Sequence, residues 1–291
     1  MQTLVLFLCG LFVFVENAVP FSEQNAAFGY IKNIGIPLAE KIRKAEESSR
    51  IIGGVPAALG QYPYQAGLLG EIVVDGGTAN SVCGGTLVSA SRILTAAHCW
   101  FDGVHQAWRL TVVLGSVRLF SGGTRVQTSA VAVHPNWNPG LIRNDLAVVY
   151  LSGPVALSGT ISPISLPSGS ELFESFAGTR AIAVGFGITS EGATINQNQS
   201  LNHVSLLVLT TGECSTAFPL IAQPSNICTS GLGTVGFCDG DTGGPLILVR
   251  DNKHILIGVS SFRSSLGCES NRSNVYSRVT SFMGFINQHI L

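Results

Sequence analysis

Short runs of apolar or alternating residues recur along the chain from about residue 51 to residue 280. Gly, Pro, Asn and Ser separate these runs, and β-branched residues are frequent within them. Runs of this length and composition are typical of strands, and their spacing predicts an all-β barrel or sandwich. The runs lie at residues 85–88, 110–114, 126–133, 146–151, 181–184, 205–209, 246–249 and 255–259.

Two segments outside this pattern have a helical period instead. Near the C-terminus, apolar side chains recur at helical spacing behind Thr280 or Ser281, either of which can cap a helix. The positions at this spacing are Phe282, Phe285, Ile286, His289 and Ile290. Before residue 51, Leu38, Ile42 and Ala45 predict a short amphipathic helix in a charged stretch that is too small to form a domain.

An apolar run of 12 residues, 4–15, lies at the start of the chain. A membrane-spanning helix needs about 20 residues, so this run predicts a signal peptide that is cut near residues 16–20. We therefore expect residues 1–18 to be removed, the protein to be secreted, and no membrane contact afterwards. The N-x-S sequons at Asn198 and Asn271 are compatible with export and glycosylation.

The cysteines fit the same interpretation. Cys9 would leave with the signal peptide, and the even number that remains predicts three disulfides, although the sequence alone does not choose among the many pairings. No CxxC or clustered Cys/His spacing favours a metal site, and neither a metal nor a cofactor is expected. The remaining cysteines are Cys83, Cys99, Cys214, Cys228, Cys238 and Cys268.

The charged residues argue against nucleic-acid binding and indicate the pH at which the protein works. Charged residues are only 11% of the chain and the formal net charge is -1, which argues against a nucleic-acid binder. Lys253 is the one Lys after residue 50, so Arg supplies nearly all the positive charge there. Because Arg keeps its proton to higher pH than Lys, this pattern suits an alkaline medium such as a gut lumen, although compositional drift would also produce it.

Three segments carry residue types suited to nucleophilic catalysis. Residues 94–99 read Leu-Thr-Ala-Ala-His-Cys, residues 144–148 read Asn-Asp-Leu-Ala-Val, and residues 236–245 read Gly-Phe-Cys-Asp-Gly-Asp-Thr-Gly-Gly-Pro. The first two are ordinary when taken singly, whereas the third is highly specific. In this order, and after Arg-Ile-Ile-Gly-Gly at 50–54, they resemble the chymotrypsin-like (trypsin) family of serine proteases, and in detail its insect digestive chymotrypsins.

The resemblance covers residues 51–291, about four-fifths of the chain. It implies two perpendicular six-stranded β-barrels, at about 51–165 and 166–291, with a C-terminal helix and the active site between the barrels. It implies a monomer that acts on a protein or peptide substrate. It also implies the disulfides Cys83–Cys99, Cys214–Cys228 and Cys238–Cys268.

The family's catalytic roles can be carried over residue by residue. His98 would be the general base and then the general acid, and Asp145 would hold its imidazole in the productive tautomer. The hydroxyl of Thr242 would attack the peptide carbonyl. The backbone N–H groups of Gly240 and Thr242 would form the oxyanion hole.

The resemblance further implies a zymogen with residues 19–50 as its activation propeptide. A trypsin-like protease would cut after Arg50, and the freed ammonium of Ile51 would pair with Asp241, a buried charge that needs a partner. Because residues 19–50 contain no Cys, we expect the propeptide to be lost after the cut.

The chain departs from the family at the nucleophile, where Thr242 replaces Ser. Thr keeps the hydroxyl, but its methyl group restricts χ1 and must fit into a site shaped for Ser. A displacement of about 1 Å can cost about a hundredfold in rate. Alternatively, Thr242 hydrogen-bonds to His98 and performs no chemistry.

The specificity pocket departs as well. Gly236 at its floor supplies no carboxylate, which argues against selection of Lys or Arg and for an apolar or large residue. The wall beside Ser261 and Phe262 should carry two glycines, but these positions hold Arg263 and Asn274, which should narrow or close the slot. Arg263 could instead attract an acidic substrate side chain, or turn out to solvent.

Three functional hypotheses remain. In the first, which we adopt, activity is weak or lost and the protein then works by binding. In the second, it is an active digestive-type endopeptidase with a Thr nucleophile and altered specificity. The third, an exported structural or storage protein, has no sequence feature in its favour.

Overall fold

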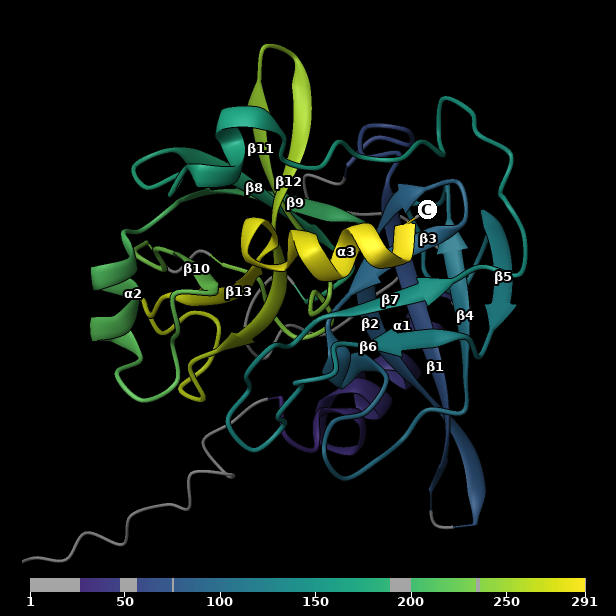
Figure 1. Ribbon diagram of the computed structural model, residues 1–291. Helices are drawn as coiled ribbons and strands as arrows, with labels where there is room; N and C mark the ends of the chain where they lie inside the picture. Colours follow the sequence, from purple (N-terminus) through teal and green to yellow (C-terminus); the bar gives the residue numbers. More distant parts are fainter. Residues whose placement is uncertain (1–26, 48–56, 75, 189–199, 234–235, 291) are drawn as a thin grey trace, which may run out of the picture.

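The computed structural model describes residues 27–47, 57–74, 76–188, 200–233 and 236–290. The predicted signal peptide, the Arg50–Ile51 bond and the sequon at Asn198 lie outside these residues. Within them, the strands form two curled antiparallel sheets that lie side by side (Figure 1). The predicted all-β class is therefore confirmed.

The first sheet contains seven strands in the order β5-β4-β1-β2-β3-β7-β6. Its two longest strands, β1 and β2, form a hairpin that extends beyond the rest of the sheet (Figure 1). The strands are β1 (Gln65–Val74), β2 (Gly77–Ser89), β3 (Arg92–Thr95), β4 (Arg109–Leu114), β5 (Thr124–Thr128), β6 (Val131–Val133) and β7 (Ala147–Tyr150).

The run at 126–133, predicted as one strand, is divided in two. β5 pairs with β4, whereas β6 pairs with β7 at the opposite edge of the sheet. Between them, the hydroxyl of Thr128 donates to the carbonyl of Tyr150 at 2.6 Å, and the N–H of Tyr150 donates to Ala130 at 2.9 Å. The chain thus passes from one edge to the other, which is why the sheet has seven strands where the resemblance implies six.

The second sheet contains six strands in the order β10-β13-β12-β11-β8-β9. A bulge between Ser260 and Phe262 leaves Ser261 without a partner in the register of β12 and β13. Such bulges change the direction of a side chain. The strands are β8 (Arg180–Gly185), β9 (Asn202–Leu207), β10 (Asn226–Thr229), β11 (Pro245–Arg250), β12 (Lys253–Arg263) and β13 (Asn274–Arg278).

Both predicted helices are confirmed. The C-terminal helix α3 (Met283–Ile290) follows the 3-10 turn η4 (Val279–Phe282) and buries Ile286. It is fixed to the first sheet because Arg92 donates to the carbonyl of His289 at 2.8 Å. The N-terminal helix α1 (Ile36–Glu47) continues from a π-helical turn, η1 (Ile31–Gly35).

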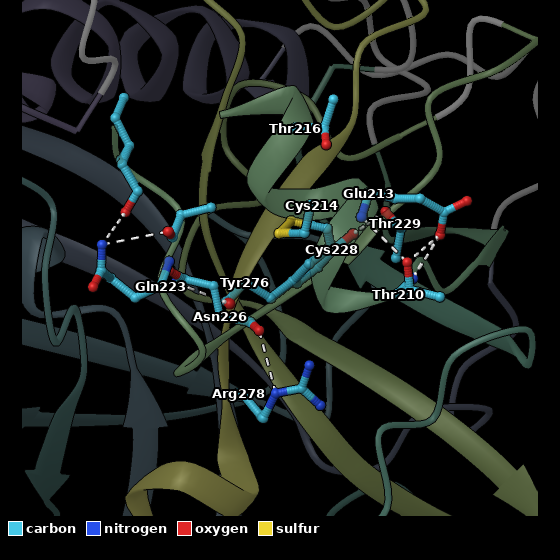
Figure 2. Close-up of a disulfide and its surroundings, with 12 residues drawn as sticks. Thr210, Glu213, Cys214, Thr216, Gln223, Asn226, Cys228, Thr229, Tyr276 and Arg278 are labelled. Carbon is cyan, nitrogen blue, oxygen red and sulfur yellow. Dashed lines mark hydrogen bonds between the residues drawn. A yellow bond between two sulfur atoms is a disulfide. The ribbon is translucent and has the colours of Figure 1, made fainter. Parts of the chain in front are cut away.

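Short helical turns occupy the connections. They are η2 (Ala97–Cys99), η3 (Gly169–Phe173) and α2 (Thr211–Ala217). α2 begins with a capping box in which Thr210 and Glu213 satisfy each other's backbone N–H groups. The disulfide Cys214–Cys228 joins α2 to β10 (Figure 2).

The largest apolar core includes residues of both sheets together with α1 and α3. Leu38, Ala39 and Ile42 from α1 are buried in this core, and so is Ile286 from α3. The N-terminal segment is therefore part of the folded unit rather than an appendage. In the described part of the chain, no helix combines the length and apolar character needed to cross a membrane.

Candidate active site

His98 lies in η2, directly after β3, and is held by Asp145. Its ring Nδ1 is 2.7 Å from Oδ2 of Asp145, and its backbone N–H donates to Oδ1 at 3.0 Å. Both side chains are almost completely buried, with exposed fractions of 0% and 1%. The two contacts fix both the position and the orientation of the imidazole.

Asp145 lies two residues before the start of β7 and receives two further hydrogen bonds from the second sheet. Ser261 donates to its Oδ2 at 2.6 Å, and Ser277 donates to its backbone carbonyl at 2.7 Å. Burial raises the pKa of Asp145, but the charge of His98 and the hydrogen bonds from His98 and Ser261 together lower that pKa below its usual value. The carboxylate is therefore ionised at neutral pH.

Ser261 makes a contact that the sequence did not predict. Its place in the wall of the specificity pocket stays a prediction, and its hydroxyl is directed to Asp145. The bulge in β12 explains this direction, because Ser261 has no opposite residue in β13. Ser277 was not predicted at all, since a Ser in an apolar strand gives no signal of the carbonyl it meets.

Thr242 lies in the tight loop before β11 and is 5% exposed. Its carbonyl accepts from Gly84 in β2 at 2.6 Å, and the N–H of Gly243 donates to Ser260 at 2.8 Å. Gly240 and Gly243 have φ values of 96° and 82°, a region that favours glycine. A Cβ at Gly243 would also meet the carbonyl oxygen of Gly84 at 2.5 Å.

His98 and Thr242 are not hydrogen-bonded to each other. Nε2 of His98 is buried and has no hydrogen-bond partner within the described residues. The ring of Tyr30, from the N-terminal segment, packs edge-on against the imidazole at 5.1 Å between centroids. The side chain of Thr242 and the backbone of Gly240 also act on the Tyr30 hydroxyl by lowering its pKa, against the larger raising effect of burial. Sequence reasoning missed Tyr30, because it lies outside the helical pattern of that segment.

Asp241 is held by backbone N–H groups. Gly187 donates to its Oδ1 at 2.7 Å and Cys238 donates to its Oδ2 at 2.9 Å. Burial, with a smaller effect from the charge of Asp239, raises the pKa of Asp241 to about 6. Its expected partner Ile51 and the cleavage residue Arg50 lie outside the described residues.

Two of the residues predicted for the specificity pocket, Gly236 and Asn274, lie in contact, and the side chain of Asn274 fills the space against Gly236. A Cβ built on Gly236 would overlap the amide of Asn274, so the Asn274 side chain lies directly against the pocket floor. Asn274 is 2% exposed, and its Nδ2 has no hydrogen-bond partner in the described ranges. Arg263, its neighbour across β12 and β13, does not turn to solvent: it pairs with Asp239 at 2.5 Å and donates to Ser264 at 3.1 Å.

Phe262 lies behind this slot. Its ring is 3% exposed and packs edge-to-face on Phe218 at 5.5 Å. It therefore supports the wall from the apolar cluster around the Cys214–Cys228 disulfide rather than lining the slot.

The three disulfides are the pairs that the resemblance implies. Cys83–Cys99 joins β2 to the turn that carries His98. Cys238–Cys268 joins the Thr242 loop to the segment between β12 and β13. Asn271, in that segment, is exposed and its side-chain oxygen accepts from the N–H of Gly233 at 3.0 Å. Two of the disulfides thus brace the loops that carry His98 and Thr242.

No cluster of three or more His, Cys, Asp or Glu side chains that could hold a metal is present in the part of the chain that the structure describes.

Comparison with known proteins agrees with the geometry. The trypsin family profile matches residues 51–286. The collagenase of Hypoderma lineatum is 37% identical over 82% of this chain and 87% of its own, and brachyurin of Leptuca pugilator is 33% identical over 81% of this chain and 96% of its own. The solved structure of the HL collagenase superimposes with a TM-score of 0.72 at 38% identity, covering 82% of this chain and 97% of that one.

Proposed function

The chain belongs to the trypsin family of serine proteases, and from this premise we propose that it is a secreted zymogen of a slow chymotrypsin-type endopeptidase. The observation that carries the proposal is the buried pair of His98 and Asp145, completed by Ser261. A buried imidazole with an ionised carboxylate on one nitrogen and no hydrogen bond on the other is prepared to accept a proton.

The catalytic step that we propose uses the tautomer that Asp145 favours. With Nδ1 protonated and donating to Asp145, Nε2 of His98 carries a lone pair. The hydroxyl of Thr242 loses its proton to Nε2 as its oxygen bonds to the peptide carbonyl carbon. The imidazolium then gives this proton to the leaving amine, and water hydrolyses the acyl-threonine ester by the same route in reverse.

The methyl group of Thr242 is the reason that we expect a slow reaction. Thr242 is 5% exposed, and backbone hydrogen bonds to Gly84 and Ser260 hold its loop, so the backbone has little freedom to shift and accommodate an added methyl group. Rotation of χ1 toward His98 would bring the methyl group toward the position of a bound substrate. We expect a loss of about a hundredfold relative to a Ser nucleophile, in line with a misplacement of about 1 Å.

The filled slot determines the substrate class that we propose. Since the Asn274 side chain lies against Gly236, an aromatic ring cannot enter to the floor. An acidic side chain would have to compete with Asp239 for Arg263. We therefore assign peptide bonds that follow small residues to this site.

Activation would proceed through Asp241. The carboxyl lies beside the Thr242 loop and has a pKa raised to about 6 by burial. An ammonium freed at Ile51 by a trypsin-like enzyme would favour the ionised carboxylate, and this pairing would stabilise the loop that positions Thr242.

A second candidate function is that of an inactive homologue that acts by binding. It is favoured by the missing hydrogen bond between Thr242 and Nε2 of His98, together with the occupied slot. In that case the cleft would bind a protein ligand without cutting it.

One experiment separates the two candidates. The chain is cut after Arg50, the residues before Ile51 are removed, and the remaining domain is incubated with a peptide library; the products are identified by mass spectrometry, and His98→Ala is the matched control. Slow cleavage after small residues, abolished in His98→Ala, supports the endopeptidase. Identical product patterns for the wild type and His98→Ala would overturn it and leave the binding function.

A further inference from the structure

Residues 27–47, hereafter the N-terminal segment, cover the catalytic groups. Figure 1 draws the segment in purple beside the first sheet. Seven of its apolar side chains are buried, although it has neither a disulfide nor a strand to hold it in the described ranges. They are Ala27, Tyr30, Ile31, Leu38, Ala39, Ile42 and Ala45.

Tyr30 is the residue of this segment that reaches the catalytic centre. Its side chain is 2% exposed, and its hydroxyl donates to the carbonyl of Val82 in β2 at 2.9 Å. Its ring lies against His98 at 5.1 Å between centroids, and Thr242 and Gly240 interact with its hydroxyl. Tyr30 thus lies beside His98 and close to Thr242 and Gly240, the residues that would otherwise face a substrate carbonyl.

Leu38 closes the same site from α1. A Cβ on Gly240 would lie 2.7 Å from Cδ2 of Leu38, so this side chain rests on the backbone of the Thr242 loop. Tyr30 and Leu38 together cover the loop, and His98 and Thr242 are left with exposed fractions of 0% and 5%.

Polar contacts anchor the segment at both ends. At its start, the N–H of Ile31 donates to Oδ2 of the fully buried Asp102 at 2.8 Å, and the N–H of Gly29 donates to the carbonyl of Asp102 at 3.2 Å.

The anchor at the other end is Glu46, which is 8% exposed. Its carboxylate accepts from the backbone N–H groups of Leu119 and Phe120, at 2.7 and 3.0 Å, and from the hydroxyl of Ser121 at 2.9 Å. A buried carboxylate that accepts three hydrogen bonds holds its partners in one geometry, so Glu46 fixes this end of the segment to residues 119–121.

We propose that the N-terminal segment is an inhibitor of this chain's own catalytic cleft, with Tyr30 placed across the catalytic groups, and that it stays bound without a covalent link after cleavage at Arg50. The inference rests on the proposed function only in its use of that cleavage site. It replaces the expectation that the propeptide is lost after the cut. Activation then needs two steps, cleavage and departure of the segment.

The test measures binding of the N-terminal segment to the protease domain, not catalytic activity. It therefore gives a result even if the domain has no activity. Residues 47–50 of the full chain are replaced by Ile-Glu-Gly-Arg, and factor Xa cuts after position 50. The products are separated by gel filtration under native conditions. We expect the cleaved segment to elute with the protease domain, and a segment that elutes alone at micromolar concentration would overturn the proposal.

Synthetic peptides of residues 27–47 then test the role of Tyr30 without altering the folding of the domain. The domain is freed of its segment in mild denaturant and refolded with its disulfides intact. Binding of fluorescein-labelled peptide is followed by anisotropy. A buried anchor residue typically dominates such an interface, so we expect Tyr30→Ala to weaken binding by more than about thirtyfold.

Two further peptides serve as matched comparisons. Tyr30→Phe removes only the hydroxyl and should weaken binding by about five- to tenfold. Glu40→Gln changes an exposed residue that pairs with Arg43 and Lys44 inside the helix, so it should leave affinity within about twofold. Equal affinities for Tyr30→Ala and Glu40→Gln would contradict the assigned role of Tyr30, whatever the catalytic activity proves to be.

Discussion

Replacing Asp241 by Asn removes a buried carboxyl group. In the chain that has not been cut after Arg50, burial makes ionisation of this group unfavourable. Its oxygens accept from Gly187 and Cys238 at 2.7 and 2.9 Å, which favours the charged form. Burial nevertheless dominates, with help from the negative charge of Asp239 and against the positive charge of Arg263. The net effect raises the pKa of Asp241 from 3.8 to about 6.

The direction of the pH effect follows from linkage. A group whose pKa is higher in the folded state than in the unfolded chain binds its proton more tightly when folded. The contribution of Asp241 to the free energy of unfolding is therefore fully present below about pH 4, and it is lost as the pH rises through about 6. Each step of one in pKa is worth about 1.4 kcal/mol, so the raised pKa of Asp241 corresponds to about 3 kcal/mol in the free energy of unfolding.

The assay is urea unfolding of the uncleaved chain at a series of pH values between 4 and 8, with disulfides intact. The difference between the wild type and Asp241→Asn isolates this residue, because the other titrating groups are common to both proteins. We expect the wild type to lose up to about 3 kcal/mol relative to Asp241→Asn between pH 4 and pH 7. Parallel curves for the two proteins would refute the assignment of a raised pKa to Asp241.

Three other variants have expected outcomes. Changing both Cys214 and Cys228 to Ser should lower the free energy of unfolding by about 3 kcal/mol, because a short loop is no longer closed in the unfolded chain; urea unfolding checks this, and an unchanged midpoint would contradict it. Asp145→Asn should lower kcat by about ten-thousandfold, as the corresponding change does in trypsin, because the imidazole of His98 loses its productive tautomer. Steady-state kinetics on the best library peptide measures kcat, and a loss below tenfold would argue against a catalytic role for His98 and Asp145. The double change Arg263→Gly and Asn274→Gly should open the slot and raise kcat/KM for peptides with Phe or Tyr before the cut by tenfold or more; an unchanged preference in the same library would show that these side chains do not obstruct it.

The pair of His98 and Asp145 was predictable because their motifs, in order with the motif around Thr242, resemble those of a known family. The structure brings the two side chains within 2.7 Å. The contact from Ser261 was not predictable in this way. It depends on a bulge in the register between β12 and β13, and alternation along one strand contains no information about its neighbour's register.

β1 shows why some strands were missed. It contains Gly67 and Gly70, which interrupt the apolar run that would have marked it. A side chain at Gly67 would collide with Leu119, and one at Gly70 would approach Ser81 at 3.0 Å. Glycine is needed at these two positions because side chains from other strands and loops pack closely against the backbone of β1. Those side chains are distant in sequence, so the sequence of the strand alone does not reveal the need for glycine.

The N-terminal helix was predicted, but its partner surface was not. Leu38, Ile42 and Ala45 specify an apolar face, and that face is buried as expected. Nothing in a helical period says which surface the face will cover. Tyr30 in particular precedes the helix, so its place against His98 follows only from the tertiary packing.

Thr242→Ser tests the central claim most directly, since it removes one methyl group from the nucleophile and leaves His98 and Asp145 unchanged. Both proteins are cut after Arg50, freed of the N-terminal segment, and compared by kcat/KM on the same small-residue peptide. The account predicts an increase of about a hundredfold in Thr242→Ser, because the oxygen regains its freedom to align with Nε2 of His98. An unchanged or lower kcat/KM in Thr242→Ser would contradict it.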